Sequence, residues 1–266
     1  MQQIRFWEMN KIDLLRTDIT ITATDAVATS TGQSLVNRVR NRDNNSAWLT
    51  TDSTDAANTE FLIEMGTSIT IDTAIIVGHN LEDYTLDYWN GSAYVNFITK
   101  SGDTLSTTHH VFTEINTTKV KLTITGCQVV DADKVIKQLV LTKVVGQLNA
   151  YPVIKKPVVS RNKIKTRMLS GKLNMVESIE SFSCSLSIKA LSNTNDMEIL
   201  ENLYFSVRPF IVSLSGMDDS QFRSALRGYR NEDLFVMKTV NEYTPEWLNG
   251  VYINQKVKVD LSEVIE

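Results

Sequence analysis

The clearest pattern in the chain is a strict alternation of apolar and polar residues between positions 181 and 190. Successive side chains of a strand point to opposite faces, so this pattern predicts a strand with one packed and one solvated face. Four serines and Lys189 occupy the solvated face, and the packed positions are Phe182, Cys184, Leu186, Ile188 and Ala190. Similar runs predict further strands over residues 210–214, 234–240 and 252–261.

Alternation also dominates the first half of the chain. Tyr84, Leu86 and Tyr88 alternate with polar residues and Trp89, and the Asn90-Gly91 pair that follows is a strong hairpin signal. Residues 33–40 are ambiguous between a short helical turn and a loop. The other strands expected here cover residues 17–25, 135–143 and a hairpin formed by 111–115 and 120–124.

One helix is expected, over residues 196–205. Asn195 is placed to cap its first turn, Glu198 stands at the third helical position, and Pro209 follows its end. The buried stripe expected for this helix consists of Met197, Leu200 and Tyr204.

A change of composition near residue 150 divides the chain into two parts. Residues 146–163 contain two of the four prolines, Pro152 and Pro157, among several basic residues. Because proline interrupts regular strand pairing, we expect a linker or arm over 146–163, between a domain of residues 1–145 and a domain of residues 164–266. The fold class is mainly β: a β-sandwich, then an antiparallel β-sandwich with one flanking helix.

Four short motifs follow one another in the first domain: Ser46-Ala47-Trp48, Met65-Gly66, Ile71-Asp72 and Gly78-His79-Asn80-Leu81. Their order resembles the discoidin-like (coagulation factor 5/8 C-type) family of galactose-binding jelly rolls. The resemblance covers roughly the first half of the chain. It implies that the first domain is a jelly-roll β-sandwich.

The resemblance also implies one candidate metal site. In that family a polar turn supplies oxygen ligands to a structural calcium, and a late glutamate completes the site. The matching positions hold Asn41, Asp43 and Ser46, with Gln138 in place of the glutamate. Calcium affinity depends on the number of charged ligands, and asparagine and glutamine side chains are neutral. We therefore expect no cofactor and favour turn capping by these polar side chains over structural calcium.

The strand–helix–strand–strand order of the second domain resembles the ring-forming domains of phage tail tubes and distal tail proteins. This resemblance implies a structural protein that forms a homo-oligomeric ring near the tail tip or baseplate. Its partners would be other tail proteins, and its location would be a virion assembled in the host cytoplasm. Two long loops, residues 216–233 and 241–250, offer residue types that are enriched at interfaces: Arg223, Arg227, Arg230, Tyr243 and Trp247.

The alternative function is recognition of cell-surface glycans by the jelly roll. A sugar site needs an aromatic platform with a few polar groups around it. Trp89, Tyr94 and Phe97, beside the Asn90-Gly91 hairpin, are the candidates, although cross-strand aromatic pairs more often serve sheet packing.

Composition and charge argue against several other functions. With 27 Lys and Arg against 31 Asp and Glu, the net charge of -4 gives no reason to expect specific nucleic-acid binding. No run of about 20 apolar residues is present, so we expect no membrane insertion. Cys127 and Cys184 stand in different halves, and we expect two buried thiols rather than a disulfide.

Catalysis is not expected either. The three histidines form no His-Glu-x-x-His motif, and no nucleophile motif or phosphate-binding loop is present. We expect His79 to pack in a turn and His109 and His110 to be exposed at a loop tip. The sequence therefore predicts no catalytic residue.

Overall fold

A computed structural model describes residues 4–25, 31–41, 46–50, 58–149, 153–167, 173–191, 194–206, 208–214, 234–240, 246–247 and 255–264. The chain forms two compact units. The sheet unit combines Met1–Met9 with Val145–Gly216 and Asp233–Glu266, and the jelly-roll unit is formed chiefly by Asn10–Val144. The first nine residues therefore belong with the C-terminal half, which the expected division at residue 145 did not anticipate.

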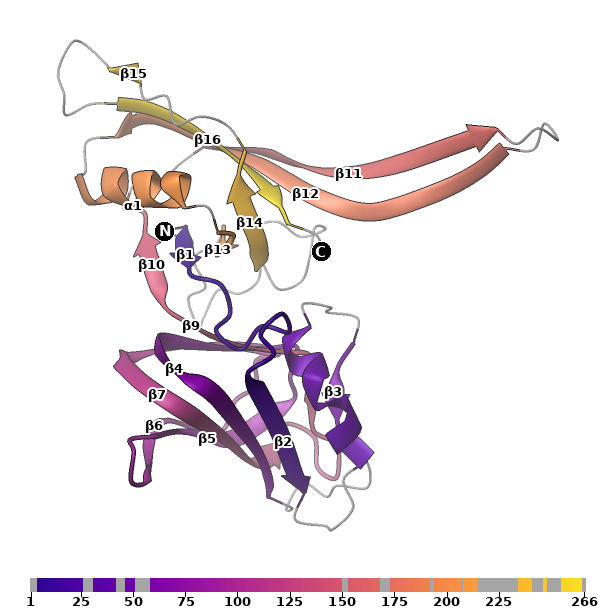
Figure 1. The fold of residues 1–266 in the computed structure, drawn as a ribbon, viewed down its shortest axis with the longest axis vertical. Helices are drawn as coiled ribbons and strands as arrows, with labels where there is room; N and C mark the ends of the chain where they lie inside the picture. Colours follow the sequence, from indigo (N-terminus) through magenta and orange to yellow (C-terminus); the bar gives the residue numbers. More distant parts are fainter. Residues whose placement is uncertain are drawn as a thin grey trace. The chain divides into compact units, whose positions relative to one another are not determined.

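The sheet unit contains one large antiparallel sheet and one α-helix (Figure 1). Its strands follow the order β10-β1-β13-β14-β16-β12-β11, and β15 pairs with β16 beside that path. The elements are β1 (Arg5–Trp7), β10 (Val144–Gln147), β11 (Val153–Arg167), β12 (Leu173–Leu191), α1 (Thr194–Phe205), β13 (Phe210–Ser213), β14 (Phe235–Thr239), β15 (Glu246–Trp247) and β16 (Gln255–Glu263).

Strands β11 and β12 continue far beyond the rest of the sheet. β12 pairs with β16 only between Ser183 and Leu191, whereas it pairs with β11 from Ser187 back to Leu173. Residues 159–167 and 173–182 are thus paired only with each other within the described chain. We call this two-stranded segment the ribbon; Figure 1 shows it leaving the sheet as a pair of arrows. At about 3.3 Å per residue it is roughly 30 Å long.

The stretch that we expected to be a linker or arm, residues 146–163, is strand over much of its length, because it includes the end of β10 and most of β11. Pro157 falls in a break of register between Lys155 and Val158. It stands on the edge strand of the sheet, where the missing N–H removes no bond that a neighbouring strand needs. Proline here marks an irregular edge rather than the end of regular structure.

Helix α1 begins earlier than predicted and buries a different stripe, formed by Asp196, Ile199, Leu200 and Leu203. Asp196 is buried because its Oδ1 accepts hydrogen bonds from the backbone N–H of Asn149, at 3.0 Å, and from the Asn149 side chain, at 3.1 Å. The helix also packs closely on β10. A Cβ at Gly146 would lie 2.5 Å from Ile199 Cδ1, so only glycine fits at that position.

The jelly-roll unit is a β-sandwich, as the first half of the sequence predicted. The main sheet has the strand order β2-β4-β7-β5-β6, with β9 paired to β4, and β3 pairs separately with β8. The elements are β2 (Ile19–Asp25), the 3-10 helix η1 (Thr31–Arg40), β3 (Trp48–Leu49), β4 (Thr59–Val77), β5 (Leu81–Trp89), β6 (Tyr94–Lys100), β7 (Thr107–Cys127), β8 (Val135–Ile136) and β9 (Gln138–Thr142).

The long strands β4 and β7 belong to both halves of this sandwich. They pair along their whole length, through a break of register between Glu64 and Ile69. Before the break β4 also pairs with β2, and after it with β9. The buried side chains of both halves form one core that includes Phe61, Ile71 and Leu139.

Two details of this unit differ from the sequence prediction. The hairpin expected from residues 111–115 and 120–124 is one continuous strand, β7, because the polar residues between the two runs pair with β4 on either side of the register break instead of turning. The β5–β6 hairpin closes at the pair Trp89–Tyr94, so its loop contains four residues rather than two. Asn90 Oδ1 stabilises this loop by accepting the backbone N–H groups of Ser92 and Ala93.

Candidate functional site

Three of the four residues that the calcium pattern selected lie together. Asn41 Nδ2 donates to Ser46 Oγ at 2.8 Å, and Gln138 Nε2 donates to Asn41 Oδ1 at 3.0 Å. The Gln138 amide also approaches the backbone oxygen of Arg38 at 3.4 Å. Asp43 lies outside the described residues. The turn and the closing strand β9 are therefore joined by direct amide hydrogen bonds.

This arrangement does not fit a bound calcium ion. Calcium takes about six to eight oxygen ligands. Here the Asn41 carbonyl and the Ser46 hydroxyl, two oxygens that would have to face the ion, accept hydrogen bonds from amide N–H groups. The described part of the chain also contains no group of three or more His, Cys, Asp or Glu side chains able to hold a metal.

The aromatic residues selected for a sugar platform are only partly brought together. Trp89 and Tyr94 are cross-strand partners at the end of the β5–β6 hairpin, with ring centroids 5.2 Å apart and planes at 64°. Both rings are half-buried. Phe97 instead packs against Phe112, at 4.6 Å, and Tyr88, at 6.0 Å, on the core side. Phe97 is three positions from Tyr94 in β6, so the alternation of side chains along the strand places it on the face opposite the Trp89–Tyr94 pair.

Polar groups converge on the Trp89–Tyr94 pair. The Lys121 ammonium lies 5.1 Å from the centre of the Tyr94 ring and 3.8 Å from Asp87 Oδ2. Asn96 Nδ2 donates to Asp87 Oδ1 at 3.0 Å. An aromatic edge-to-face pair thus stands beside an ammonium, a carboxylate and an amide, which is the combination that binds a polar ligand with an apolar face. We call these five residues the hairpin patch.

Two of the three histidines, His109 and His110, lie in different surroundings from those expected. His109 and His110 are within strand β7 rather than at a loop tip; His109 is buried and His110 is half-buried. The correction follows from the length of β7, whose first residues pair with the buried second half of β4.

His79 is one end of a buried hydrogen-bonded network in the jelly roll. Its Nδ1 accepts the backbone N–H of Leu81 at 3.2 Å, so its Nε2 carries the proton that points to Thr108 Oγ1 at 2.7 Å. Thr108 donates to Asp103 Oδ2 at 2.6 Å, and Tyr84 donates to the same oxygen at 3.1 Å. Every member has a partner, as buried polar groups require.

The chemistry of this network is structural. Burial lowers the pKa of His79 from 6.5 to about 4, against the attraction of Asp103. At neutral pH the ring is therefore uncharged. Thr108 is fully buried, so its hydroxyl cannot meet a substrate. The sequence did not predict the partners of His79 in this network, because no spacing rule connects it to Asp103, Thr108 or Tyr84.

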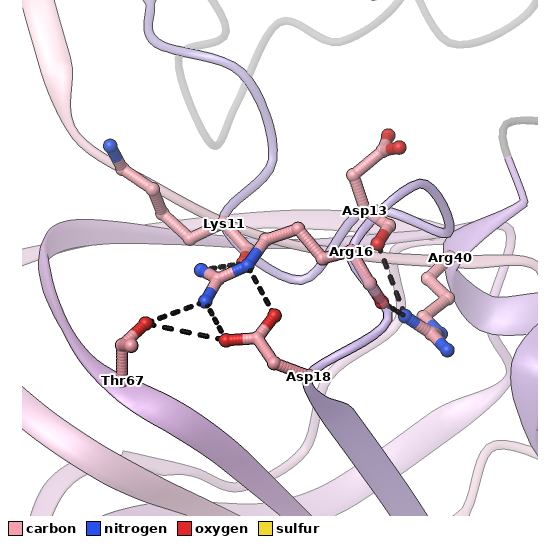
Figure 2. A network of polar contacts seen from close by, with 6 residues as sticks. All are labelled: Lys11, Asp13, Arg16, Asp18, Arg40 and Thr67. Atoms are coloured by element: carbon pink, nitrogen blue, oxygen red, sulfur yellow. Dashed lines mark hydrogen bonds and ion pairs between the residues drawn. The ribbon is translucent and has the colours of Figure 1, made fainter.

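A second polar network anchors the segment before β2, and Figure 2 shows it. The Arg16 guanidinium grips both Asp18 oxygens, with Nε–Oδ1 at 3.0 Å, and also donates to Thr67 Oγ1 at 2.8 Å and to the Lys11 carbonyl at 2.9 Å. The hydrogen bonds from Arg16 lower the pKa of the Asp18 carboxyl.

The buried Arg40, at the end of η1, completes the anchor. Its guanidinium donates to the backbone carbonyls of Asp13 and Arg16, both at 3.1 Å. These groups bond one another and the backbone, so the network in Figure 2 fixes a loop and offers no converging set of groups to a ligand.

Most of the interface residues expected on the two loops cannot be placed. Arg223, Arg227, Arg230 and Tyr243 lie outside the described residues. The backbone of Trp247 is described: it forms β15 and pairs with Gln255 of β16. No helix in the described ranges is long and apolar enough to cross a membrane.

If Asn41, Ser46 and Gln138 stabilise their turn without metal, chelation should leave the fold unchanged. We expect the Tm with excess EDTA to equal the Tm with millimolar calcium. Because a ligand that binds only the folded state raises its stability, a Tm several degrees higher in calcium would contradict this expectation.

The lowered pKa of His79 predicts a loss of stability in acid. The unfolded chain takes up a proton near pH 6.5, but the folded chain does so only near pH 4, so the free energy of unfolding should fall as the pH decreases through this window, by up to about 3 kcal/mol. The variant His79→Gln should lose this dependence. Urea unfolding of both proteins at pH 7.5 and pH 5 measures it.

The pKa of Asp103 is also lowered, but Asp103 does not contribute to the change in stability between pH 7.5 and pH 5. Its ordinary value of 3.8 means that its contribution is lost only at a lower pH. An identical loss of stability between pH 7.5 and pH 5 in both proteins would show that His79 is not responsible.

Searches against family models and against curated proteins found no match. Solved structures with a similar fold include carbohydrate-binding modules. A chitosan-binding module from a chitosanase/glucanase of Paenibacillus sp. IK-5 is 13% identical over 51% of this chain and 98% of its own, with a TM-score of 0.42. The family 32 module of Streptococcus pneumoniae EndoD is 12% identical over 50% of this chain and 99% of its own, with a TM-score of 0.42.

A third module, CpGH89CBM32-5 from Clostridium perfringens, was solved in complex with GalNAc-β-1,3-galactose. It is 17% identical over 47% of this chain and 94% of its own, with a TM-score of 0.39. None of the three structures named here is a phage tail protein. At these identities and TM-scores no function passes from them to this chain.

Proposed function

We propose that this chain is a structural component of a phage tail or related injection apparatus. It assembles with its own copies, and with other tail proteins, through the sheet unit, as a ring near the tail tip or baseplate. The jelly-roll unit is the part that it displays or that contacts neighbours. The observation that carries this proposal is the ribbon formed by β11 and β12.

The ribbon supports assembly because two strands alone bury too little surface. An isolated two-stranded hairpin is at best marginally stable in water, and it needs a third strand or another element to pack against. Within the described chain the ribbon has neither a third strand nor a strand beyond β11. A second copy of the chain supplies the missing neighbour.

The order of elements in the sheet unit supports the kind of assembly. The observed sequence β12, α1, β13, β14 and β16 retains the strand–helix–strand–strand order on which the resemblance to ring-forming phage tail domains rests. Contacts between two different patches of neighbouring copies form a ring when the rotation between copies closes. The loops of residues 216–233 and 241–250, including Trp247, remain part of the proposed contact surface.

Shortening the ribbon tests assembly. Replacing residues 160–181 by Asn-Gly joins β11 to β12 at the observed pair Val159–Phe182 and leaves the pairing of β12 with β16 intact. We expect the natural chain to form oligomers in mass photometry and negative-stain images and the shortened chain to be a folded monomer. A natural chain that stays monomeric at tens of micromolar, or a shortened chain that still assembles, would contradict the proposal.

A second function is favoured by the hairpin patch: binding of a cell-surface glycan by the jelly roll. The half-buried Trp89 and Tyr94 rings would contact the apolar face of a sugar ring. Asp87, Asn96 and Lys121 would form hydrogen bonds with its hydroxyl groups.

A glycan array followed by calorimetry tests this function. If a sugar binds, Trp89→Ala should weaken its affinity about tenfold, the effect of losing roughly 1.4 kcal/mol of contact. Val130→Ala, at a 75% exposed apolar residue of the same unit, is the matched control and should leave the affinity unchanged. If the natural chain and Trp89→Ala bind the sugar with equal affinity, the hairpin patch is not the glycan-binding site.

A further inference from the structure

The outward face of α1 carries acidic groups and an exposed aromatic ring. Its exposed residues include Glu198, Glu201, Asn202 and Phe205, which recur at helical spacing on the side opposite the buried stripe. The helix contains three acidic residues and no basic one. Phe205 is 73% exposed, which is unusual for a ring of that size on an element that is otherwise packed.

The ribbon has the opposite charge. The sequence of β11 holds six basic residues and no acidic one, and the β12 residues of the ribbon add two glutamates. The basic residues are Lys155, Lys156, Arg161, Lys163, Lys165 and Arg167. Lys155 and Lys156 precede the ribbon, which itself holds four basic residues and two glutamates. Glu180 stands opposite Arg161 and Glu177 opposite Lys163, so the excess positive charge of the ribbon lies at Lys165 and Arg167, whereas the chain as a whole has a net charge of -4.

Within one copy, a stretch of β12 lies between these two elements along the chain. The first residues of β12, 173–182, belong to the ribbon. Helix α1 starts at Thr194, just after the last residue of β12. The paired segment Ser183–Leu191 lies between them and is held in the sheet by β16. At about 3.3 Å per residue this segment spans roughly 30 Å between the ribbon and the start of α1.

We propose that the ribbon of one copy lies along the exposed face of α1 in a second copy, the basic strand β11 facing Glu198 and Glu201 and the contact including Phe205. This inference rests on the assembly proposed above and specifies its contact. Complementary charges orient the two copies and fix which surfaces meet. Aromatic side chains are enriched where such contacts are strongest. Because the ribbon and α1 are different patches, the contact joins copies head to tail.

Charge reversal on each side tests the contact. One variant combines Glu198→Lys with Glu201→Lys, and the other combines Lys165→Glu with Arg167→Glu. In either variant alone, like charges meet at every contact, so we expect the concentration needed for half-maximal assembly to rise at least about tenfold. In an equal mixture each reversed α1 meets a reversed ribbon, and each natural α1 meets a natural ribbon. The mixture should therefore assemble although neither variant does.

The control variant combines Glu82→Lys with Asp133→Lys, which changes the net charge on the jelly-roll unit by the same amount and sign as the α1 variant; it should assemble like the natural chain. Circular dichroism establishes that each variant is folded. If neither reversal affects assembly, or the mixture fails to recover it, the α1 contact is overturned. The proposed function stands in that case provided that shortening the ribbon still abolishes assembly. If the shortened chain assembles normally, the proposed function fails as well.

Discussion

The sheet unit depends on a pairing between the start of the chain and a strand of its C-terminal half. Strand β1 binds to β13, with Phe6 opposite Val212, so residues about 200 positions apart are neighbours in one sheet. Phe6 and Trp7 are fully buried, and the Phe6 ring packs edge-on against Phe210 at 5.8 Å. Since β10 follows the jelly roll in sequence and joins the same sheet beside β1, the whole jelly roll is an insertion between two adjacent strands. The sheet cannot be completed from the C-terminal half alone.

Much of the fold was predictable from the sequence because strand alternation is a local signal. Residues 181–190 and 84–89 show it without interruption, and both are strands. The errors arose where the decisive contact is distant. Nothing in Arg5–Trp7 indicates that its partner is β13. The stripe of α1 was misplaced because Asp196, a residue type that is usually exposed, is buried by its bonds to Asn149.

The candidate sites were predictable in residue type and less so in arrangement. The sequence indicated that Asn41 and Gln138 replace carboxylates, but only the structure shows that their amides bond each other. The hairpin signal placed Trp89 and Tyr94 near one turn, but the two-residue loop that it implies does not give their observed pairing across a four-residue loop. Phe97 was grouped with them although it is three positions from Tyr94, a spacing that in a strand already places two side chains on opposite faces.

The basic composition of β11 also has a consequence for the chain before it meets any partner. A long strand at the edge of a sheet exposes unpaired backbone groups, which invite indiscriminate pairing and aggregation. Lysine and arginine along such an edge counter this, because two equally charged edges repel each other. The positive charge that we propose to suit β11 to an acidic surface would therefore also oppose edge-to-edge pairing between newly made chains. The solubility of the unassembled chain and the selectivity of its assembly contact would then both come from the positive charge of β11.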